Sequence, residues 1–236
     1  MDRNYVSTNK LLSILPVEDY ATIVPDLEHV QLRMGAAIAM EGSPIDYVYF
    51  LTSGIGSLLT HTPEGRTAEA GVFGPEGYVP TSAIAGVEIS SYDVLIQSEA
   101  EADRMSYHRF RQHMLESKNF SKLMIRSIEA FSIQLAYNAI SNALHDVTER
   151  LARWLLMCHD RVPGHEITLT HEFLSTMLAV RRPSVTTSLH VLEGNGYIRA
   201  ERGRITIRNR SALEEFAHDA YGKPEREYDR LFQNLF

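Results

Sequence analysis

The sequence predicts an α+β protein: an N-terminal double-stranded β-roll (jelly-roll-like), then a long helix, then a C-terminal winged helix-turn-helix. Three observations support this prediction. Short strand-like runs fill residues 28–106, a helical heptad pattern follows them, and the last third holds two short helices before an arginine-rich hairpin. We therefore expect three parts, at residues 1–118, 119–145 and 146–236.

The composition indicates a protein that works outside membranes and without disulfides. The chain has 236 residues, a formal net charge of -7 and one cysteine, Cys158. A single thiol can neither form an internal disulfide nor hold an iron–sulfur cluster. No window of about 18 consecutive apolar residues exists, and the N-terminus lacks a basic start followed by an apolar run. We expect a cytoplasmic protein with no membrane partner.

The N-terminal half begins with short helical pieces and continues as strands. Pro16 and Pro25 interrupt the helical pattern of residues 9–32. The runs YVYFLTSG, IGSLLTHT, AEAGVF and YDVLIQ have strand length and are bounded by turn residues. The segment TPEGR predicts a hairpin turn, because Pro63 and Gly65 flank an acidic residue. Strands at this spacing are typical of a small sandwich or barrel.

A heptad stripe runs along the long helix, which we expect from about residue 119 to 144. The stripe steps by four, three, four, three and four residues through Met124, Ile128, Phe131, Leu135, Asn138 and Asn142. We interpret it as the seam of a homodimer, since a buried asparagine at such a position favours two strands over more. A helix packed on its own domain needs the same stripe, so that alternative stays open.

The last third of the chain predicts two short helices joined by a tight turn, which is a helix-turn-helix. Thr170 suits the N-cap of a first helix over residues 171–178. The second helix begins at Pro183, whose missing N–H costs nothing at that position, and two glycines end it. An amphipathic helix over residues 146–162 precedes both.

The second of these helices presents a narrow, mainly polar face. Its apolar positions recur at helical spacing and are expected to face the core: Val185, Leu189 and Leu192. The opposite face holds Pro183, Ser184, Thr187, His190 and Val191. Such a surface is narrow enough to enter a DNA major groove. Arg181 and Arg182 stand at the helix N-terminus, where backbone amides attract phosphate and an arginine can bind guanine.

An arginine-rich hairpin follows the second helix. The segment YIRAERGRITIRN predicts strand, turn and strand, with Arg202 next to the turn glycine. Residues 163–212 hold seven arginines against four glutamates, whereas residues 1–162 hold 13 basic against 20 acidic residues. A local positive island of this kind can bind polyanions despite the negative net charge. We expect the hairpin to grip the DNA backbone beside the groove.

Two other classes of protein compete with a DNA-binding protein. In a ligand-binding or scaffold module, the helix-turn-helix would contact only protein. A cupin-like metal enzyme would need a His-x-His pair with a nearby glutamate, and His61 has no partner at that spacing. No glycine-rich phosphate loop and no G-x-S-x-G segment occurs. We therefore predict that the protein is not an enzyme and holds neither a metal nor a cofactor.

The whole chain resembles the Crp/Fnr family of bacterial transcription regulators. The most specific part of the resemblance is LTHEFLSTMLAVRRPSVTTSLHVLEGNGYI, with DVTERLARWLL ahead of it. The resemblance implies a homodimer that places two recognition helices in successive major grooves of a near-palindromic operator, with RNA polymerase as a further partner. By motif position, it implies that Thr170 contacts phosphate and that Arg182, Ser184 and Thr187 lie at base-reading positions. Pro183 departs from the commonest pattern, which has a glutamate or another polar residue there.

The resemblance also implies an effector pocket in the β-roll, and here the chain departs from the family. Members that bind cyclic nucleotides hold the ribose with a glutamate and the phosphate with an Arg-Ser pair. Thr81 matches the glutamate, and Ser90 and Ser91 match the pair. No arginine or lysine lies between Arg66 and Arg104, so a buried phosphate would be poorly compensated. We expect cyclic AMP and cyclic GMP not to bind in the usual way, which leaves the effector unknown.

The iron–sulfur and haem sensors found in the family that this chain resembles do not fit the sequence either. An iron–sulfur sensor needs several cysteines, and this chain has one. A haem sensor needs an axial ligand, and the histidines at positions 29, 61, 108 and 113 are scattered in a way typical of surface or structural residues. We expect Cys158 to be a buried, inert thiol rather than a redox switch.

Overall fold

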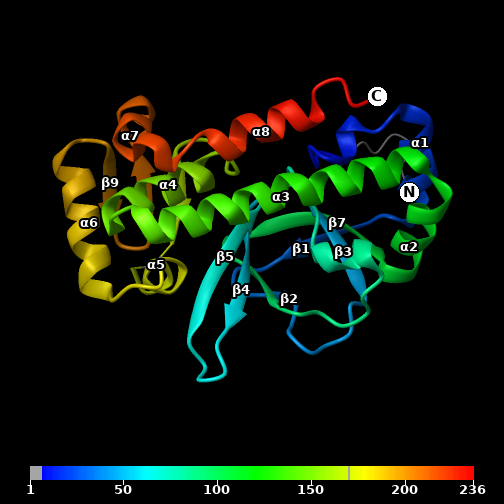
Figure 1. Ribbon diagram of the computed structural model, residues 1–236, viewed down its shortest axis with the longest axis horizontal. Helices are drawn as coiled ribbons and strands as arrows, with labels where there is room; N and C mark the ends of the chain where they lie inside the picture. The colour runs from blue at the N-terminus through cyan, green and yellow to red at the C-terminus, as the bar shows by residue number, and fades with distance from the viewer. Residues whose placement is uncertain (1–6, 170) are drawn as a thin grey trace.

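The computed structural model describes residues 7–169 and 171–236, and it confirms the predicted fold class. A β-roll forms the N-terminal half, one long helix crosses the molecule beside it, and a helical part with a small sheet follows (Figure 1). Within the described residues, no helix combines the length and the apolar character that crossing a bilayer requires.

The N-terminal half consists of two antiparallel sheets. The strand order is β1-β7-β3 in the first sheet and β2-β6-β4-β5 in the second. The strands are β1 Glu28–Leu32, β2 Ala37–Ala39, β3 Tyr47–Leu51, β4 Gly56–His61, β5 Thr67–Phe73, β6 Asp93–Ile96 and β7 Ala100–Ser106. The predicted turn TPEGR connects β4 to β5, with His61 opposite Thr67 and Gly65 at φ +79°. Apolar side chains of both sheets, including Leu51 and Ile96, form one core.

Helical segments cover one end of the β-roll. They are the 3₁₀ helix Leu12–Ile14, α1 Val17–Ile23, the 3₁₀ helix Val24–Asp26, the 3₁₀ helix Thr81–Ala85 and α2 Tyr107–Glu116. As predicted, Pro16 stands just before α1 and Pro25 lies in the next 3₁₀ turn. A second apolar cluster ties these segments together, in which the ring of Phe110 lies 5.5 Å from Tyr78 and 5.6 Å from Phe120.

The long helix α3 (Lys118–Leu144) turns its predicted heptad stripe toward its own chain. Near the start of the helix, Met124 is fully buried in the second apolar cluster. Near its end, Asn138 donates from Nδ2 to the carbonyl oxygen of Ala70 on β5 at 2.7 Å. Both residues therefore stabilise the contact between α3 and the β-roll.

The middle of the stripe lies on β5. A Cβ added at Gly71 would lie 2.9 Å from Phe131 and 2.9 Å from Leu135, so these side chains cover the strand closely. Ile128 packs on the second apolar cluster, and only Asn142 is exposed. The interpretation of this stripe as a dimer seam is therefore corrected: it packs on its own domain, because heptad spacing cannot say which surface a stripe meets.

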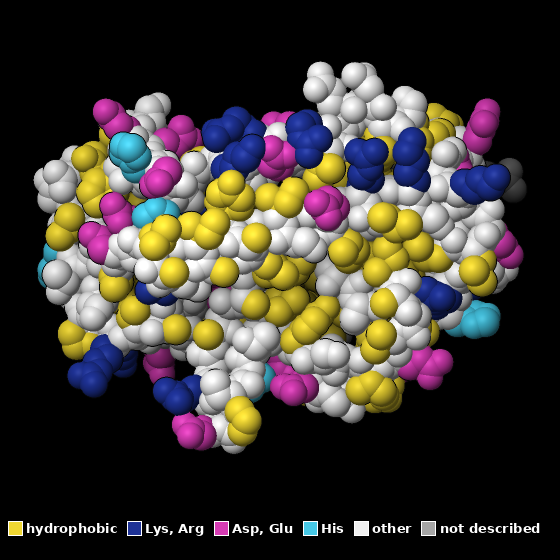
Figure 2. All heavy atoms as spheres, in the orientation of Figure 1, with side chains coloured by type: hydrophobic (Ala, Val, Ile, Leu, Met, Phe, Trp, Pro, Cys, Tyr) yellow, Lys and Arg dark blue, Asp and Glu magenta, His cyan; other side chains and the backbone are white. Residues whose placement is uncertain are grey.

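The part of α3 that faces away from the β-roll exposes apolar side chains. Ile125, Ile140 and Leu144 expose 57%, 45% and 76% of their surface. Figure 2 shows hydrophobic side chains gathered along this helix, which faces the viewer.

The C-terminal part combines a helix-turn-helix with a three-stranded sheet of order β8-β10-β9. Its elements are α4 Val147–His159, β8 Glu166–Thr168, α5 His171–Met177, α6 Arg182–Gly194, β9 Ile198–Glu201, β10 Arg204–Ile207, α7 Arg210–Ala217, the 3₁₀ helix His218–Ala220 and α8 Lys223–Phe232. The predicted hairpin is β9–β10, and β8 adds a strand that the sequence did not indicate. A capping box of Asp146 and Glu149 begins α4. The apolar side that the sequence predicts for this helix consists of Val147, Leu151, Trp154 and Leu155, and all but the half-buried Val147 are buried.

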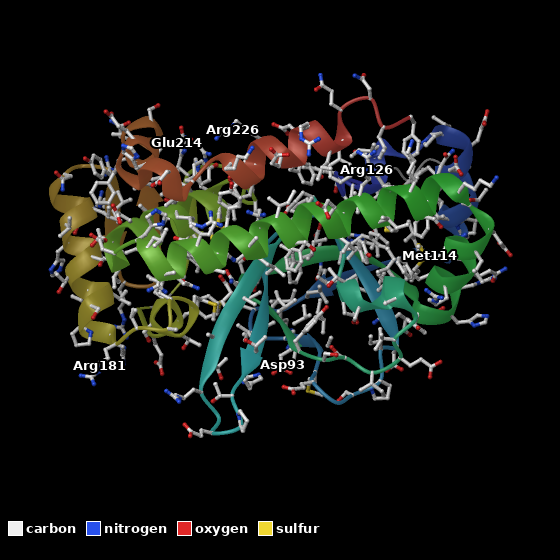
Figure 3. The ribbon with its side chains drawn as sticks, viewed as in Figure 1. Asp93, Met114, Arg126, Arg181, Glu214 and Arg226 are labelled. Carbon is white, nitrogen blue, oxygen red and sulfur yellow. The ribbon has the colours of Figure 1, made fainter. Side chains whose placement is uncertain are left out.

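The last helix, α8, runs back along α3 and ties the C-terminal part to the rest (Figure 1). Arg126 of α3 donates from Nη1 to the carbonyl oxygen of Leu231 at 2.9 Å, and Figure 3 shows Arg126 between the two helices. The hydroxyl of Tyr228 donates to the backbone oxygen of Glu76 in the β-roll at 3.0 Å. Helix α8 is not predicted by the sequence patterns described above.

Candidate nucleic-acid interface

The helix-turn-helix is formed by α5, a short turn and α6. In the turn, Ala179 adopts φ +50°, and the N–H of Val180 donates to the carbonyl oxygen of Ser175 at 3.0 Å. The buried side of α6 is the predicted one: Val185, Leu189 and Leu192. These side chains share one core with Trp154 of α4 and Leu174 of α5, so α6 is fixed on a rigid base. The predicted N-cap Thr170 lies outside the described residues.

The outer face of α6 is open to solvent. Its exposed residues are Arg181, Arg182, Pro183, Thr187, His190 and Val191, and Ser184 is half-buried. The helix begins at Arg182, one residue earlier than predicted, with Arg181 as N-cap and Pro183 in the first turn. Figure 3 shows Arg181 at this end of α6, pointing away from the body of the molecule. Two guanidinium groups thus flank a helix N-terminus, which itself attracts anions.

The wing β9–β10 carries arginines of two kinds. Arg199 and Arg204 both bind Glu201, at 2.8 Å and 2.9 Å, so part of their charge is neutralised within the wing. Arg202 and Arg208 are exposed, and neither forms an ion pair with another described residue. These two arginines keep their charge available for phosphate.

Arg210, the last of the seven arginines in this region, serves the fold instead. Its guanidinium lies 2.7 Å from Asp160 at the end of α4 and 2.7 Å from Glu214 on α7. It also donates to the hydroxyl of Tyr221 at 2.7 Å. The surface available to nucleic acid is therefore smaller than the count of arginines suggests.

Two family models match the chain. Residues 149–216 match the Crp-like helix-turn-helix domain, and residues 29–117 match the cyclic nucleotide-binding domain. The chain belongs to the Crp/Fnr family. Members are transcription regulators rather than enzymes, and this chain is a DNA-binding regulator of that type.

The chain is also similar to individual regulators of the CRP type. The CRP-like cAMP-activated global transcriptional regulator of Mycobacterium tuberculosis is 24% identical over 202 residues, which are 82% of this chain and 89% of the relative. TTHB099, a CRP-family regulator from Thermus thermophilus, has the same fold, with 19% identity, a TM-score of 0.68, and coverage of 80% of this chain and 96% of that one. The c-di-GMP responsive global regulator CLP of Xanthomonas campestris has 16% identity and a TM-score of 0.65, and the match covers 81% and 99% of the two chains.

Two of the three positions that match the nucleotide-binding residues of Crp/Fnr proteins, Thr81 and Ser90, are hydrogen-bonded to Tyr92. Thr81 shares a hydrogen bond of 2.6 Å between its Oγ1 and the hydroxyl of Tyr92. Ser90 is buried and donates to the backbone oxygen of Tyr92 at 2.7 Å, whereas Ser91 is exposed. Thr81 lines a large cavity, and neither serine does.

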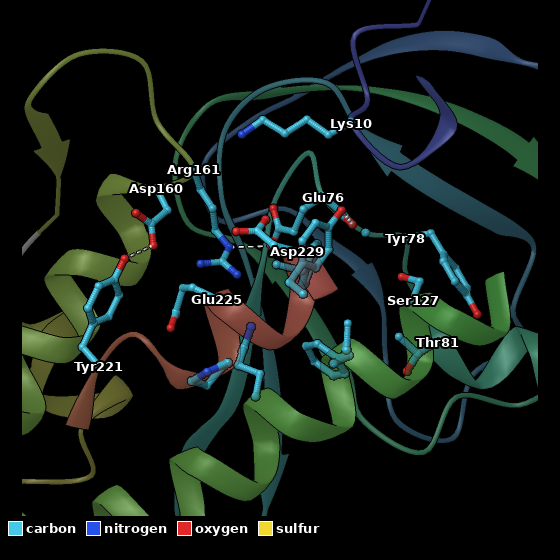
Figure 4. A pocket seen from close by; sticks show the side chains of 17 residues that line it. Lys10, Glu76, Tyr78, Thr81, Ser127, Asp160, Arg161, Tyr221, Glu225 and Asp229 are labelled. Atoms are coloured by element: carbon cyan, nitrogen blue, oxygen red, sulfur yellow. Dashed lines mark hydrogen bonds and ion pairs between the residues drawn. The ribbon is translucent and has the colours of Figure 1, made fainter. Parts of the chain in front are cut away.

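This cavity has a volume of about 320 Å³ and lies where the β-roll, α3, the end of α4 and α8 meet (Figure 4). Arg161 is its most buried charged residue, with 9% of its side chain exposed. The Nε atom of Arg161 lies 2.7 Å from a carboxylate oxygen of Glu76. The sequence does not predict this site, because its walls come from segments far apart in the chain.

In this Crp/Fnr protein the thiol of Cys158 is buried, and two histidines of the β-roll lie beside carboxylates. Cys158 is fully buried, as predicted, and burial raises the pKa of its thiol well above the ordinary value. His61 lies 2.8 Å from Asp93, and His113 lies 2.8 Å from Asp26, in different parts of the β-roll. In the described ranges, no three histidine, cysteine or acidic side chains gather as a metal would require.

Proposed function

We propose that this regulator acts as a homodimer whose two α6 helices enter successive major grooves of a near-palindromic operator. The observation that supports this most is the open face of α6, which starts at Arg181 and Arg182 and meets no other part of the described chain (Figure 1). An α-helix fits the major groove of B-DNA. Cytoplasmic location and contact with RNA polymerase belong to this proposal, as does the phosphate contact of Thr170.

Base recognition is assigned to one side of α6. Ser184, Thr187 and His190 follow one another at intervals of three residues, which places them along one side of the helix. Arg182 is the first residue of α6, where a guanidinium can bind O6 and N7 of one guanine with a discrimination of about 1–3 kcal/mol. Arg181 is at the neighbouring position and is assigned to phosphate or to a flanking base.

Phosphate binding is assigned to the wing. Arg202 is exposed beside Gly203, whose φ of +76° forms the tight turn between β9 and β10. Arg208 is exposed at the other end of β10. Contacts of such residues with phosphate position the protein on the duplex but carry no sequence information.

Dimerisation is assigned to a second heptad stripe on α3, which we call the outer stripe. Each of its residues directly follows, in the sequence, a residue of the stripe that covers β5. Its exposed members again step by four, three, four, three and four: Ile125, Glu129, Ser132, Ala136, Ala139 and Ala143. This spacing is that of a coiled-coil seam, and its small residues allow two helices to approach closely. The hydrophobic surface along α3 in Figure 2 supports the assignment.

The signal is proposed to be something other than a cyclic nucleotide bound in the usual way. The names of two relatives mention cAMP and c-di-GMP. In this chain, residues 67–103 contain neither arginine nor lysine, and Ser90 already donates to the backbone. Arg111 of α2 reaches this region, but it donates to the carbonyl oxygen of Ile84 at 2.8 Å. A cyclic phosphate would therefore lack an available cation.

Selection of bound duplexes from random DNA tests the proposed function. The purified chain is expected to enrich a near-palindromic sequence, and retention of that sequence is expected to fall steeply as salt rises. A scaffold protein whose helix-turn-helix contacts only protein would enrich no sequence and would show no salt-dependent retention.

A further inference from the structure

We propose that the cavity between α3, α8 and the β-roll binds a small organic cation with an aromatic or apolar body, such as an arylalkylamine. The cavity volume of about 320 Å³ lies at the lower end of the range of small-molecule sites. The proposal deepens the proposed function, on which its regulatory meaning rests, because it gives the signal a place and a chemical class.

The site is distinct from the positions that match the family's nucleotide-binding residues. Figure 4 shows Thr81, Tyr78 and Ser127 at one end of the cavity, and Asp160 and Tyr221 at the other end. Both α3 and α8 contribute to the wall of the cavity, and both helices lie outside the segments that match family models. Among the nucleotide-matching positions, only Thr81 contributes to the lining.

The charges of the cavity disfavour an anion. Arg161 is its buried cation, and its guanidinium is already engaged by Glu76 at 2.7 Å and by the carbonyl oxygen of Met157 at 2.6 Å. A bound phosphate or carboxylate would have to compete with both contacts. The other lining cation is Lys10, an exposed residue.

Two carboxylates of α8 leave the lining with excess negative charge. Glu225 and Asp229 line the cavity, Asp229 at an exposed position, and neither forms an ion pair with any residue that the structure describes, although the charge of Glu225 also acts on the buried Arg153. Glu225 accepts a hydrogen bond from the N–H of Gly222 at 3.0 Å, so its position is fixed. Figure 4 shows both carboxyl groups beside Arg161, in the middle of the cavity. A cation bound there would gain attraction from both, and it would need no partner to be displaced.

Aromatic side chains are the second feature of the cavity that favours an amine with an aromatic or apolar body. Phe73 comes from β5, Phe131 from α3, and Tyr221 and Tyr228 from the C-terminal part, so rings line the cavity from several sides. The ring of Tyr228 also packs at a tilt of 42° against the ring of Phe232, with 4.5 Å between the ring centroids, and its hydroxyl donates to the backbone oxygen of Glu76. Fixed aromatic rings around a desolvated ammonium give cation–π attraction, while an apolar ligand body removes their surface from water.

Isothermal titration calorimetry on the full chain tests the proposal with two amines and their carboxylate counterparts. Tryptamine or phenethylamine is expected to bind saturably, one per chain. Indole-3-propionate and 3-phenylpropionate have similar bodies and the opposite charge, and they are expected to bind at least about tenfold more weakly. The proposal is overturned if neither amine binds saturably, or if the acids bind as tightly as the amines.

Substitutions in and outside the cavity test whether the amine binds there. Ala130→Phe places a ring in the cavity from α3 and is expected to abolish amine binding, and Asp229→Asn is expected to weaken it about fivefold to tenfold. Glu215→Gln removes a charge from an exposed position of α7 outside the cavity and is expected to change nothing. Circular dichroism melting confirms that each variant is folded. Amine binding that Ala130→Phe leaves intact would overturn the proposal.

DNA binding is measured separately on the same proteins. Loss of amine binding in Ala130→Phe with intact DNA binding supports the cavity as the amine site and leaves the proposed function standing. If the chain binds amine as expected but enriches no DNA sequence, the proposed operator-binding function fails while the cavity assignment holds.

Discussion

The indole Nε1 of Trp154 donates a hydrogen bond to a carboxylate oxygen of Glu69 at 2.8 Å, and this bond joins α4 of the DNA-binding part to β5 of the β-roll. Ser57 and Gln97 of the β-roll also donate to Glu69. The sulfur of Met177 on α5 lies 3.5 Å from the hydroxyl of Ser57, so α5 meets the same cluster. A carboxyl group thus lies inside the contact between the helix-turn-helix part and the β-roll.

Glu69 makes stability depend on pH. Burial of its carboxyl group raises the pKa to about 7 from 4.5, against the lowering effect of its hydrogen bonds and of Arg161. The folded chain therefore holds this proton longer than the unfolded chain does. Protonation of Glu69 therefore adds at most about 3 kcal/mol to the free energy of unfolding. This stabilisation is fully present below pH 4.5 and is lost as the pH rises to about 7.

Glu69→Gln is predicted to remove this dependence. Urea unfolding at a series of pH values should show the difference in unfolding free energy between wild type and variant changing across that window. Trp154 is the only tryptophan, so its fluorescence reports on the same contact. Glu64→Gln, at an exposed position of the β4–β5 turn, serves as the control. Parallel profiles of wild type and Glu69→Gln would contradict the prediction.

Truncating the buried side of α6 is predicted to destabilise the DNA-binding part. Leu189 is 1% exposed, so Leu189→Ala should cost about 2–5 kcal/mol of unfolding free energy. Val191 is 41% exposed on the opposite face, and Val191→Ala should cost less than about 0.5 kcal/mol. Urea unfolding of the two variants measures the difference. Equal costs would show that the helix is not oriented as described.

A charge in the outer stripe of α3 is predicted to separate the homodimer. Ala136 is exposed in the single chain, so Ala136→Glu leaves the fold intact but places two carboxylates against each other in the pair. Light scattering should report a monomer at concentrations where the wild type is a dimer. Ala85→Glu, an exposed position on the β-roll, should remain dimeric. A dimer that survives Ala136→Glu would place the pairing surface elsewhere.

Cyclic nucleotides are predicted not to bind this chain in the usual way. Calorimetry with cyclic AMP or cyclic GMP at about 1 mM should show no saturable heat, because residues 67–103 contain no arginine or lysine and Arg111, which reaches this region, already donates to the carbonyl oxygen of Ile84. A family member that binds cyclic AMP is the positive control. Saturable binding in the micromolar range would contradict the prediction.

The sequence predicted the DNA-binding half well because its signals are local. Pro183 begins a helix by its own geometry, and the spacing of Val185, Leu189 and Leu192 determines which side of that helix is buried. The hairpin after it follows from turn chemistry around Gly203.

Other features depend on which surfaces pack against each other in the folded chain, and local sequence patterns do not predict this. Met124 and Asn138 have the spacing of a dimer seam, yet they cover their own β-roll, which offers the same apolar face as a second helix would. Arg199 and Arg204 count as positive residues in the sequence, but Glu201 lies between them once the hairpin forms. The cavity around Arg161 was missed because folding alone brings its walls together.

The most direct test of the central claim compares Arg182→Ala and Arg202→Ala on the selected operator and on random duplex DNA. Arg182→Ala should weaken operator binding by about 1–3 kcal/mol, or roughly tenfold to a hundredfold, and should affect random DNA much less. Arg202→Ala should weaken binding to both DNAs by similar factors. Equal losses for both variants on both DNAs would contradict the assignment of α6 to base recognition and of the wing to phosphate.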